Sequence, residues 1–113
     1  FVCACFRQWR KLGFPELAFR VMSKYISTDE IPSEDLLDLC KKSAVNFSTE
    51  EVTPVVRVGK AWVLELFHGP TFAFKDVALQ FLGNLFEYFL LRRRAKGEEA
   101  GLTILGATSG DTG

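Results

Sequence analysis

The segment LELFHGPTFAFKD, residues 64–76, decides how the rest of this chain is interpreted. Its lysine, Lys75, follows a Gly69-Pro70 turn signal and precedes an almost wholly apolar run from Val77 to Leu91. We therefore expect Lys75 to open a buried helix.

This position has chemical consequences for Lys75. Desolvation by Phe72 and Phe74, together with the positive end of the helix dipole, disfavours the ammonium form of a lysine. A neutral amine is a nucleophile that forms Schiff bases with aldehydes, pyridoxal phosphate among them. The alternative is structural, because most lysines beside apolar runs extend their ammonium group to water. The local sequence leaves both interpretations open.

The composition is typical of a soluble globular domain or part of one. The 113 residues are 48% hydrophobic, and 14 basic residues balance 14 acidic residues. This balance argues against a nucleic-acid or membrane-surface partner. One basic cluster, Arg92-Arg93-Arg94-Lys96, follows the apolar run, and we interpret it as the solvated end of a helix.

The cysteines Cys3, Cys5 and Cys40 predict free thiols. Their odd number and their spacing fit neither a disulfide scaffold nor a zinc hairpin, and His68 is the only histidine. We expect no metal, a reducing compartment and, by default, the cytoplasm.

The helix expected from Lys75 to about Arg94 carries one polar stripe. Gln80, Asn84 and Glu87 recur at spacings of four and three residues. They also interrupt the apolar run, which falls short of a membrane span. We interpret the stripe as the wet edge of a helix packed between a sheet and another layer, in preference to a binding surface.

The first half of the chain predicts a small helical module. One helix is expected from Pro15 to about Tyr25, and a second starts near Pro32 with acidic residues in its first turn and Lys41 and Lys42 in its last. The first has the apolar side Leu17, Phe19, Val21 and Met22, and the second has the core face Leu36, Leu37, Leu39 and Cys40.

The second half predicts strands. Residues 53–57 and 61–66 are expected to form a hairpin around Gly59-Lys60. Residues 102–105 are expected to form a buried parallel strand. The glycine- and hydroxyl-rich loop 106–113 then suits a carboxylate or phosphate, although it lacks the Gly-Lys-Ser/Thr of a P-loop. We divide the chain into a helical segment, 1–52, and the start of an α/β region, 53–113.

Two segments resemble a known family. Residues 65–81, ELFHGPTFAFKDVALQF, and 106–113, GATSGDTG, resemble the most recognisable segments of the threonine synthases, above all of their fungal-type branch. A weaker resemblance extends through 30–36 and 12–22 to about Trp9. It implies a partial α/β fold of the fold type II pyridoxal-phosphate enzymes, similar to the tryptophan synthase β chain, with N-terminal helices and the start of a parallel sheet.

The resemblance also implies a reaction. The family is a group of carbon–oxygen lyases acting on phosphates, which convert O-phospho-L-homoserine and water to L-threonine and phosphate in threonine biosynthesis. Lys75 would bind pyridoxal 5'-phosphate and transfer protons. The loop would grip the substrate carboxylate through Thr108, Ser109, Gly110 and Thr112. Asp111 replaces an asparagine that many relatives place near the cofactor ring, and it either takes that role or caps a helix.

Three more residues are candidates for the same site. His68 could contact a substrate phosphate or assist proton transfer, but we favour a hydrogen-bonded structural histidine. For Glu65 we weigh a role in the site against a structural role with the same caution as for His68. Thr71 could lie near the substrate.

Two other functions are considered. Asp111-Thr112-Gly113 matches the triplet of retroviral-type aspartic proteases, but it is short and no flap strands follow it. The second alternative is a non-catalytic binding fragment of a threonine synthase-like protein.

The chain starts at Phe1 and stops inside the expected anion loop, so we expect a fragment. In enzymes of this kind, the cofactor phosphate loop and the partner of the pyridine nitrogen lie downstream. We therefore expect the 113 residues alone to bind the cofactor poorly and to be inactive.

Overall fold

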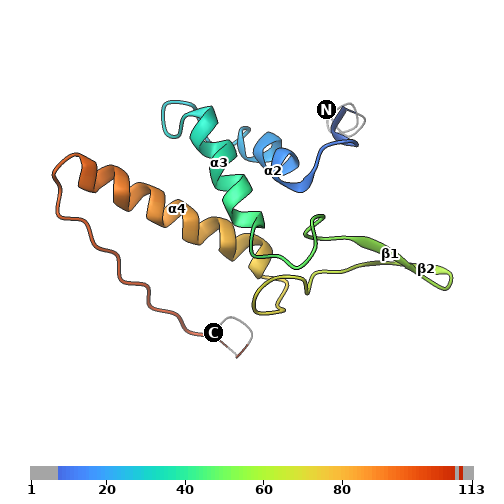
Figure 1. Cartoon of the computed structure of the whole chain (residues 1–113). Helices are drawn as coiled ribbons and strands as arrows, with labels where there is room; N and C mark the ends of the chain where they lie inside the picture. The colour runs from blue at the N-terminus through green and yellow to red at the C-terminus, as the bar shows by residue number, and fades with distance from the viewer. Residues whose placement is uncertain (1–7, 109, 111–113) are drawn as a thin grey trace.

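The computed structural model describes residues 8–108 and residue 110. Within them lie three helices and one two-stranded sheet, arranged as Figure 1 shows. The elements are α2 (Phe14–Met22), α3 (Ser33–Ala44), β1 (Val55–Val58), β2 (Ala61–Leu64) and α4 (Asp76–Ala95). The helices lie together, whereas the hairpin extends away from them (Figure 1).

Helix α2 begins where the sequence predicts and ends three residues early. Pro15 occupies its first turn, followed by Glu16. At the other end, the backbone N–H and the hydroxyl of Ser23 both donate to the carbonyl of Phe19, at 2.9 and 2.7 Å. The N–H groups of the next two residues bond three residues back, which tightens the chain and ends the α-helix.

Helix α3 has the predicted charges at its ends. Glu34 and Asp35 lie in its first turn, and Lys41 and Lys42 lie in its last. These positions complement the helix dipole. Three residues of the predicted core face, Leu36, Leu39 and Cys40, are buried, whereas Leu37 is half-buried.

The core lies between the three helices, with α3 in the middle. Its buried members are Ile31, Leu36 and Leu39. Phe19, Met22 and Ile26 pack against them from one side, and Phe81, Leu85 and Tyr88 of α4 pack from the other. The division proposed at residue 52 stays a prediction, and α3 and α4 pack together across it.

Helix α4 confirms the predicted span to within one residue at each end. Its predicted environment is wrong. Asp76 is its only buried residue among those described, because α3 covers one side and the hairpin does not pack as a sheet on the other. No helix in the described ranges, 8–108 and 110, is both long and apolar enough to cross a membrane.

The hairpin forms around Gly59-Lys60 as predicted. Val55 pairs with Leu64 and Val58 pairs with Ala61 in an antiparallel register. Gly59 adopts a φ of +61°, a conformation that glycine takes without steric cost. Both strands are shorter than predicted, since Pro54 has no N–H to donate and contributes only its carbonyl, which accepts the Glu65 N–H at 2.9 Å.

The strand predicted over 102–105 is wrong. After α4 the chain turns back and runs on as an extended segment without regular structure (Figure 1). A strand exists only through pairing, and no strand in the described part of the chain lies beside this segment. Leu105 is consequently 97% exposed.

The basic cluster after the apolar run ends the helix, as predicted. Arg92, Arg93 and Arg94 form the last turn of α4 and are exposed. Two of these arginines also bond to the segment that follows the helix. Arg93 Nε lies 2.8 Å from the Glu98 carboxylate, and the Arg94 guanidinium donates to the Ala100 carbonyl.

Candidate active site around Lys75

Lys75 directly precedes the first residue of α4, as the sequence predicts. Its backbone is already in the right-handed helical conformation. Its carbonyl accepts the N–H groups of Ala78 and Leu79 at 3.0 and 2.9 Å, which are the first bonds of the helix. The Lys75 side chain is therefore attached to a fixed backbone.

The expected shielding of Lys75 by two phenylalanines is wrong for this chain. Phe72 and Phe74 are 77% and 59% exposed, so their rings lie largely in water and cannot exclude it from the amine. The Phe74 ring instead makes a cation–π contact, with its centroid 5.7 Å from Lys75 Nζ. Lys75 is half-buried.

The loop before Lys75 is tied to the helix by Asp76. This carboxylate is only 3% exposed and accepts two hydrogen bonds from Thr71, one from the backbone N–H at 2.9 Å and one from the hydroxyl at 2.8 Å. Gly69 packs against it so closely that an added Cβ would lie 2.4 Å from Asp76 Cβ. Phe72, which closes the turn onto the Gly69 carbonyl, has a φ of +60°. Sequence reasoning missed Asp76, although an acidic residue in a first helical turn was a signal.

His68 and Glu65 form a second polar group in the same loop. Glu65 Oε2 lies 2.7 Å from His68 Nε2, and Ser48 Oγ lies 3.3 Å from His68 Nδ1. The Ser48 N–H also donates to the His68 carbonyl at 2.9 Å. This arrangement agrees with the hydrogen-bonded structural histidine favoured above. Ser48 was missed, because it lies 20 residues away in sequence.

The predicted anion loop is described only in part. The Thr108 hydroxyl oxygen accepts the Gly110 N–H at 3.2 Å, and Gly110 has a φ of +116°. Ser109, Asp111 and Thr112 lie outside the described residues. The substrate and cofactor contacts proposed for this loop stay predictions.

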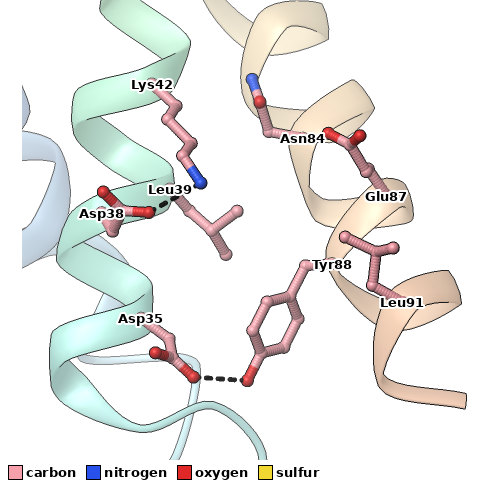
Figure 2. Close-up of a pocket in the computed structure, with 8 residues that line it drawn as sticks. All are labelled: Asp35, Asp38, Leu39, Lys42, Asn84, Glu87, Tyr88 and Leu91. Atoms are coloured by element: carbon pink, nitrogen blue, oxygen red, sulfur yellow. Dashed lines mark hydrogen bonds and ion pairs between the residues drawn. The ribbon is translucent and has the colours of Figure 1, made fainter. Parts of the chain in front are cut away.

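The polar stripe of α4 faces α3. Gln80 accepts a hydrogen bond from Asn46 at 3.0 Å, and Asn84 and Glu87 line a pocket of about 220 Å³ between the two helices (Figure 2). The remaining lining residues are Asp35, Asp38, Leu39, Lys42, Tyr88 and Leu91. The predicted position of the stripe, at the wet edge of a helix between a sheet and another layer, is therefore wrong: Gln80 and Asn84 are half-buried beside α3, and only Glu87 is exposed.

Two hydrogen bonds order the side chains of this pocket. Tyr88 donates to Asp35 at 2.8 Å, and Lys42 Nζ lies 2.8 Å from Asp38 (Figure 2). Burial, and then the bond to Asp35, raises the pKa of the Tyr88 phenol. The hydrogen bond to Asp38 raises the pKa of the Lys42 ammonium. Lys75 does not line this pocket.

Known proteins provide an independent comparison. Residues 3–44 match the family model described as the threonine synthase N terminus. The chain is 55% identical to threonine synthase of Saccharomyces cerevisiae and 54% identical to that of Schizosaccharomyces pombe, over 96% and 93% of its length. This chain is similar to the threonine synthases. The resemblance seen in residues 65–81 and 106–113 is confirmed, and identity to the Pseudomonas aeruginosa threonine synthase is lower, at 45%.

Solved threonine synthases share the fold. The yeast threonine synthase structure matches with a TM-score of 0.80 and 52% identity, covering 88% of this chain and 20% of that one. The structure described as PLP-bound threonine synthase from Brucella melitensis matches with a TM-score of 0.74 and 36% identity, covering 83% and 20%. The prediction of a partial α/β fold of this enzyme class is confirmed. The chain spans 23% and 21% of the length of the two fungal threonine synthases.

Proposed function

We propose that the protein containing this chain is a threonine synthase that uses pyridoxal 5'-phosphate. It would convert O-phospho-L-homoserine and water to L-threonine and phosphate, as a carbon–oxygen lyase of threonine biosynthesis in the cytoplasm. The observation that carries the proposal is 55% identity to a threonine synthase over 96% of the chain, with Lys75 at the start of a helix. The Brucella melitensis neighbour, described as PLP-bound, supports the choice of cofactor.

Lys75 fits the cofactor better than any other lysine of the chain. An aldehyde cofactor needs a primary amine on a fixed backbone. All seven lysines lie within residues 8–108, and six of them are exposed, whereas Lys75 is half-buried. Its backbone is held by the first turn of α4 on one side and by the tie between Thr71 and Asp76 on the other.

Different residues of this chain would bind the cofactor, transfer protons and bind the substrate. When bound, pyridoxal 5'-phosphate supplies an electron sink for bond changes on the substrate. The Lys75 amine holds the cofactor and moves protons. Thr108, Ser109, Gly110 and Thr112 would bind the substrate carboxylate through hydroxyl and backbone N–H groups, and Asp111 would either contact the cofactor ring or cap the following helix.

Borohydride trapping tests the assignment of Lys75. The protein is mixed with pyridoxal phosphate, reduced and mapped by peptide mass. We expect a pyridoxyl group on Lys75, no such label in Lys75→Ala and unchanged labelling of Lys75 in Lys60→Ala, since Lys60 is an exposed turn residue. Labelling confined to other lysines would remove the basis of the proposal. Phosphate release from O-phospho-L-homoserine then tests the substrate.

A non-catalytic role has one observation in its favour. The hairpin exposes large apolar side chains, with Val58, Trp62 and Leu64 between 54% and 70% exposed. Such surfaces are typical of protein contacts. Stable binding of another protein without any Lys75 labelling would favour this role over the enzyme.

A further inference from the structure

We propose that Asp76 is a positioning residue for Lys75, acting through Thr71. The inference rests on the proposed function of Lys75 as the cofactor-binding amine. It assigns a role to the neighbouring carboxylate and to the loop residue that it holds.

The contacts of Asp76 are unusual for a carboxylate in the first turn of an exposed helix. Its side chain is 3% exposed, and both of its oxygens accept hydrogen bonds from Thr71, five residues earlier. A carboxylate at this position interacts favourably with the positive end of the helix dipole even when it is exposed to water, so the dipole does not require burial. Burial of the group is costly and requires specific partners, which Thr71 supplies twice.

Packing fixes the carboxylate from another side. Gly69 leaves no room for a Cβ, since one would lie 2.4 Å from both Asp76 Cβ and Asp76 Oδ2. The turn between Gly69 and Phe72 is closed by a hydrogen bond of 3.1 Å and places Phe72 at a φ of +60°. This φ is sparsely populated by residues with a side chain, so surrounding contacts must hold it. The two bonds from Thr71 to Asp76 lie directly before Phe72, and the Phe72 N–H donates to the Gly69 carbonyl.

Lys75 receives its orientation from these constraints. It shares a peptide group with Asp76, and the Asp76 N–H donates to the Ala73 carbonyl at 3.1 Å. Any rotation of the helix start relative to the loop would therefore turn the Cα–Cβ bond of Lys75. Misplacement of a reacting group by about 1 Å can lower a rate on the order of a hundredfold. The hydrogen bonds between Thr71 and Asp76 would therefore control the position of the Lys75 amine relative to the cofactor aldehyde.

Thr71→Val is the primary test, and it is made in the full protein. Valine keeps the backbone donor to Asp76 and removes the hydroxyl bond of 2.8 Å. The readout is the rate constant of Lys75 labelling by pyridoxal phosphate with borohydride trapping. We expect a fall of roughly five- to a hundredfold, the range that ångström-scale misplacement produces. Thr71→Ser, which keeps the hydroxyl, should restore the wild-type rate.

Tyr88→Phe is the matched control for a merely structural role. It removes a side-chain hydrogen bond of the same length, 2.8 Å, from the same helix. We expect Tyr88→Phe to lower Tm without slowing Lys75 labelling. Because Thr71 is itself exposed, its replacement leaves the core intact, and Thr71→Ala provides a second test of the lost hydroxyl.

Asp76→Asn separates geometry from charge. Its amide oxygen accepts the Thr71 N–H, and its NH₂ donates to the Thr71 hydroxyl oxygen, so the tie persists without the negative charge. We expect labelling within about twofold of the wild type.

The outcomes are distinct. Equal labelling rates in the wild type, Thr71→Val and Thr71→Ala would overturn the positioning role while leaving the proposed function intact. A loss in Asp76→Asn with none in Thr71→Val would assign the effect to charge and also overturn it. Absence of Lys75 labelling in the wild type would overturn the proposed function itself.

Discussion

Gly69 and Gly83 lie on either side of Lys75 in sequence, in opposite packing environments. A Cβ at Gly69 would collide with Asp76, whereas a Cβ at Gly83, within α4, meets nothing within 4 Å. We predict that Gly69→Ala lowers the free energy of unfolding by about 1–3 kcal/mol, as overpacking does. Gly83→Ala should raise it by about 0.5–1 kcal/mol, because alanine favours a helix interior. Urea titrations measure both, and equal effects would contradict the close packing at Gly69.

Cys40 is expected to be an unreactive thiol. The residue is fully buried in α3, and burial raises its pKa from 9.0 to about 11. This change lowers the thiolate fraction near pH 8 by about a hundredfold. We predict correspondingly slow alkylation by iodoacetamide in the native protein and fast alkylation in urea. The measurement uses a Cys3→Ser, Cys5→Ser background, and native labelling at the unfolded rate would contradict burial.

The same thiol gives a pH dependence of stability. Because its pKa is raised in the folded state, the neutral thiol is the favoured form there. The contribution of the Cys40 thiol to the free energy of unfolding is fully present below pH 9 and is lost as the pH rises through about 11. The fall in Tm over this range should be smaller in Cys40→Ala than in the parent protein, and an identical fall in both would exclude Cys40 as a source.

At the scale of elements, the stability of the fold depends on the face that α3 turns to its neighbours. Leu36 is 2% exposed and lies in the core cluster, whereas Leu37, one residue later, is half-buried. We predict that Leu36→Ala costs about 2–5 kcal/mol through the lost contacts and the cavity that remains. Leu37→Ala should cost less than half as much. Chemical denaturation compares the two, and similar losses would mean that α3 is rotated from the orientation described.

The helices could be predicted because their signals are local. Apolar residues at helical spacing, Pro15 near one start and Lys41 and Lys42 near one end all act within a few residues. Local signals could not show whether residues 102–105 form a strand, because a strand needs a pairing partner, and that partner is distant in sequence. The shielding of Lys75 failed for the same reason: aromatic residues beside a lysine exclude water only where another segment covers them.

The sequence predicted which residues belong to the candidate site more fully than it predicted the contacts between them. Lys75 was singled out by its place between a turn and an apolar run, which is a local pattern, and its proposed cofactor role came from the family resemblance. The tie from Thr71 to Asp76 depends on the path of the loop, including the positive φ at Phe72, which a sequence pattern does not reveal. The contact of Ser48 with His68 joins segments 20 residues apart and was equally hidden.

At the scale of the whole molecule, the chain has a well-packed helical part and a largely uncovered remainder. The core cluster lies among α2, α3 and α4, whereas the hairpin and the segment after α4 expose most of their apolar side chains. Trp62 is 70% exposed and Ile104 is 71% exposed. Large exposed apolar surfaces promote association, so these two segments are where the isolated chain would contact other protein surfaces.

The same division predicts weak cofactor binding by the 113 residues alone. The proposed site supplies one attachment point, Lys75, but Phe72, Phe74 and Thr108 are exposed, and the chain spans 23% of the length of the Saccharomyces cerevisiae threonine synthase. Ligands bind tightly when a pocket buries most of their surface and supplies several converging polar groups. We predict that the isolated chain loses pyridoxal phosphate on desalting, whereas the full protein keeps close to one equivalent. Acid release of the cofactor measures both, with Lys75→Ala in each to subtract non-specific binding. Stoichiometric retention by the 113 residues would show that the Lys75 loop and α4 hold the cofactor without further protein.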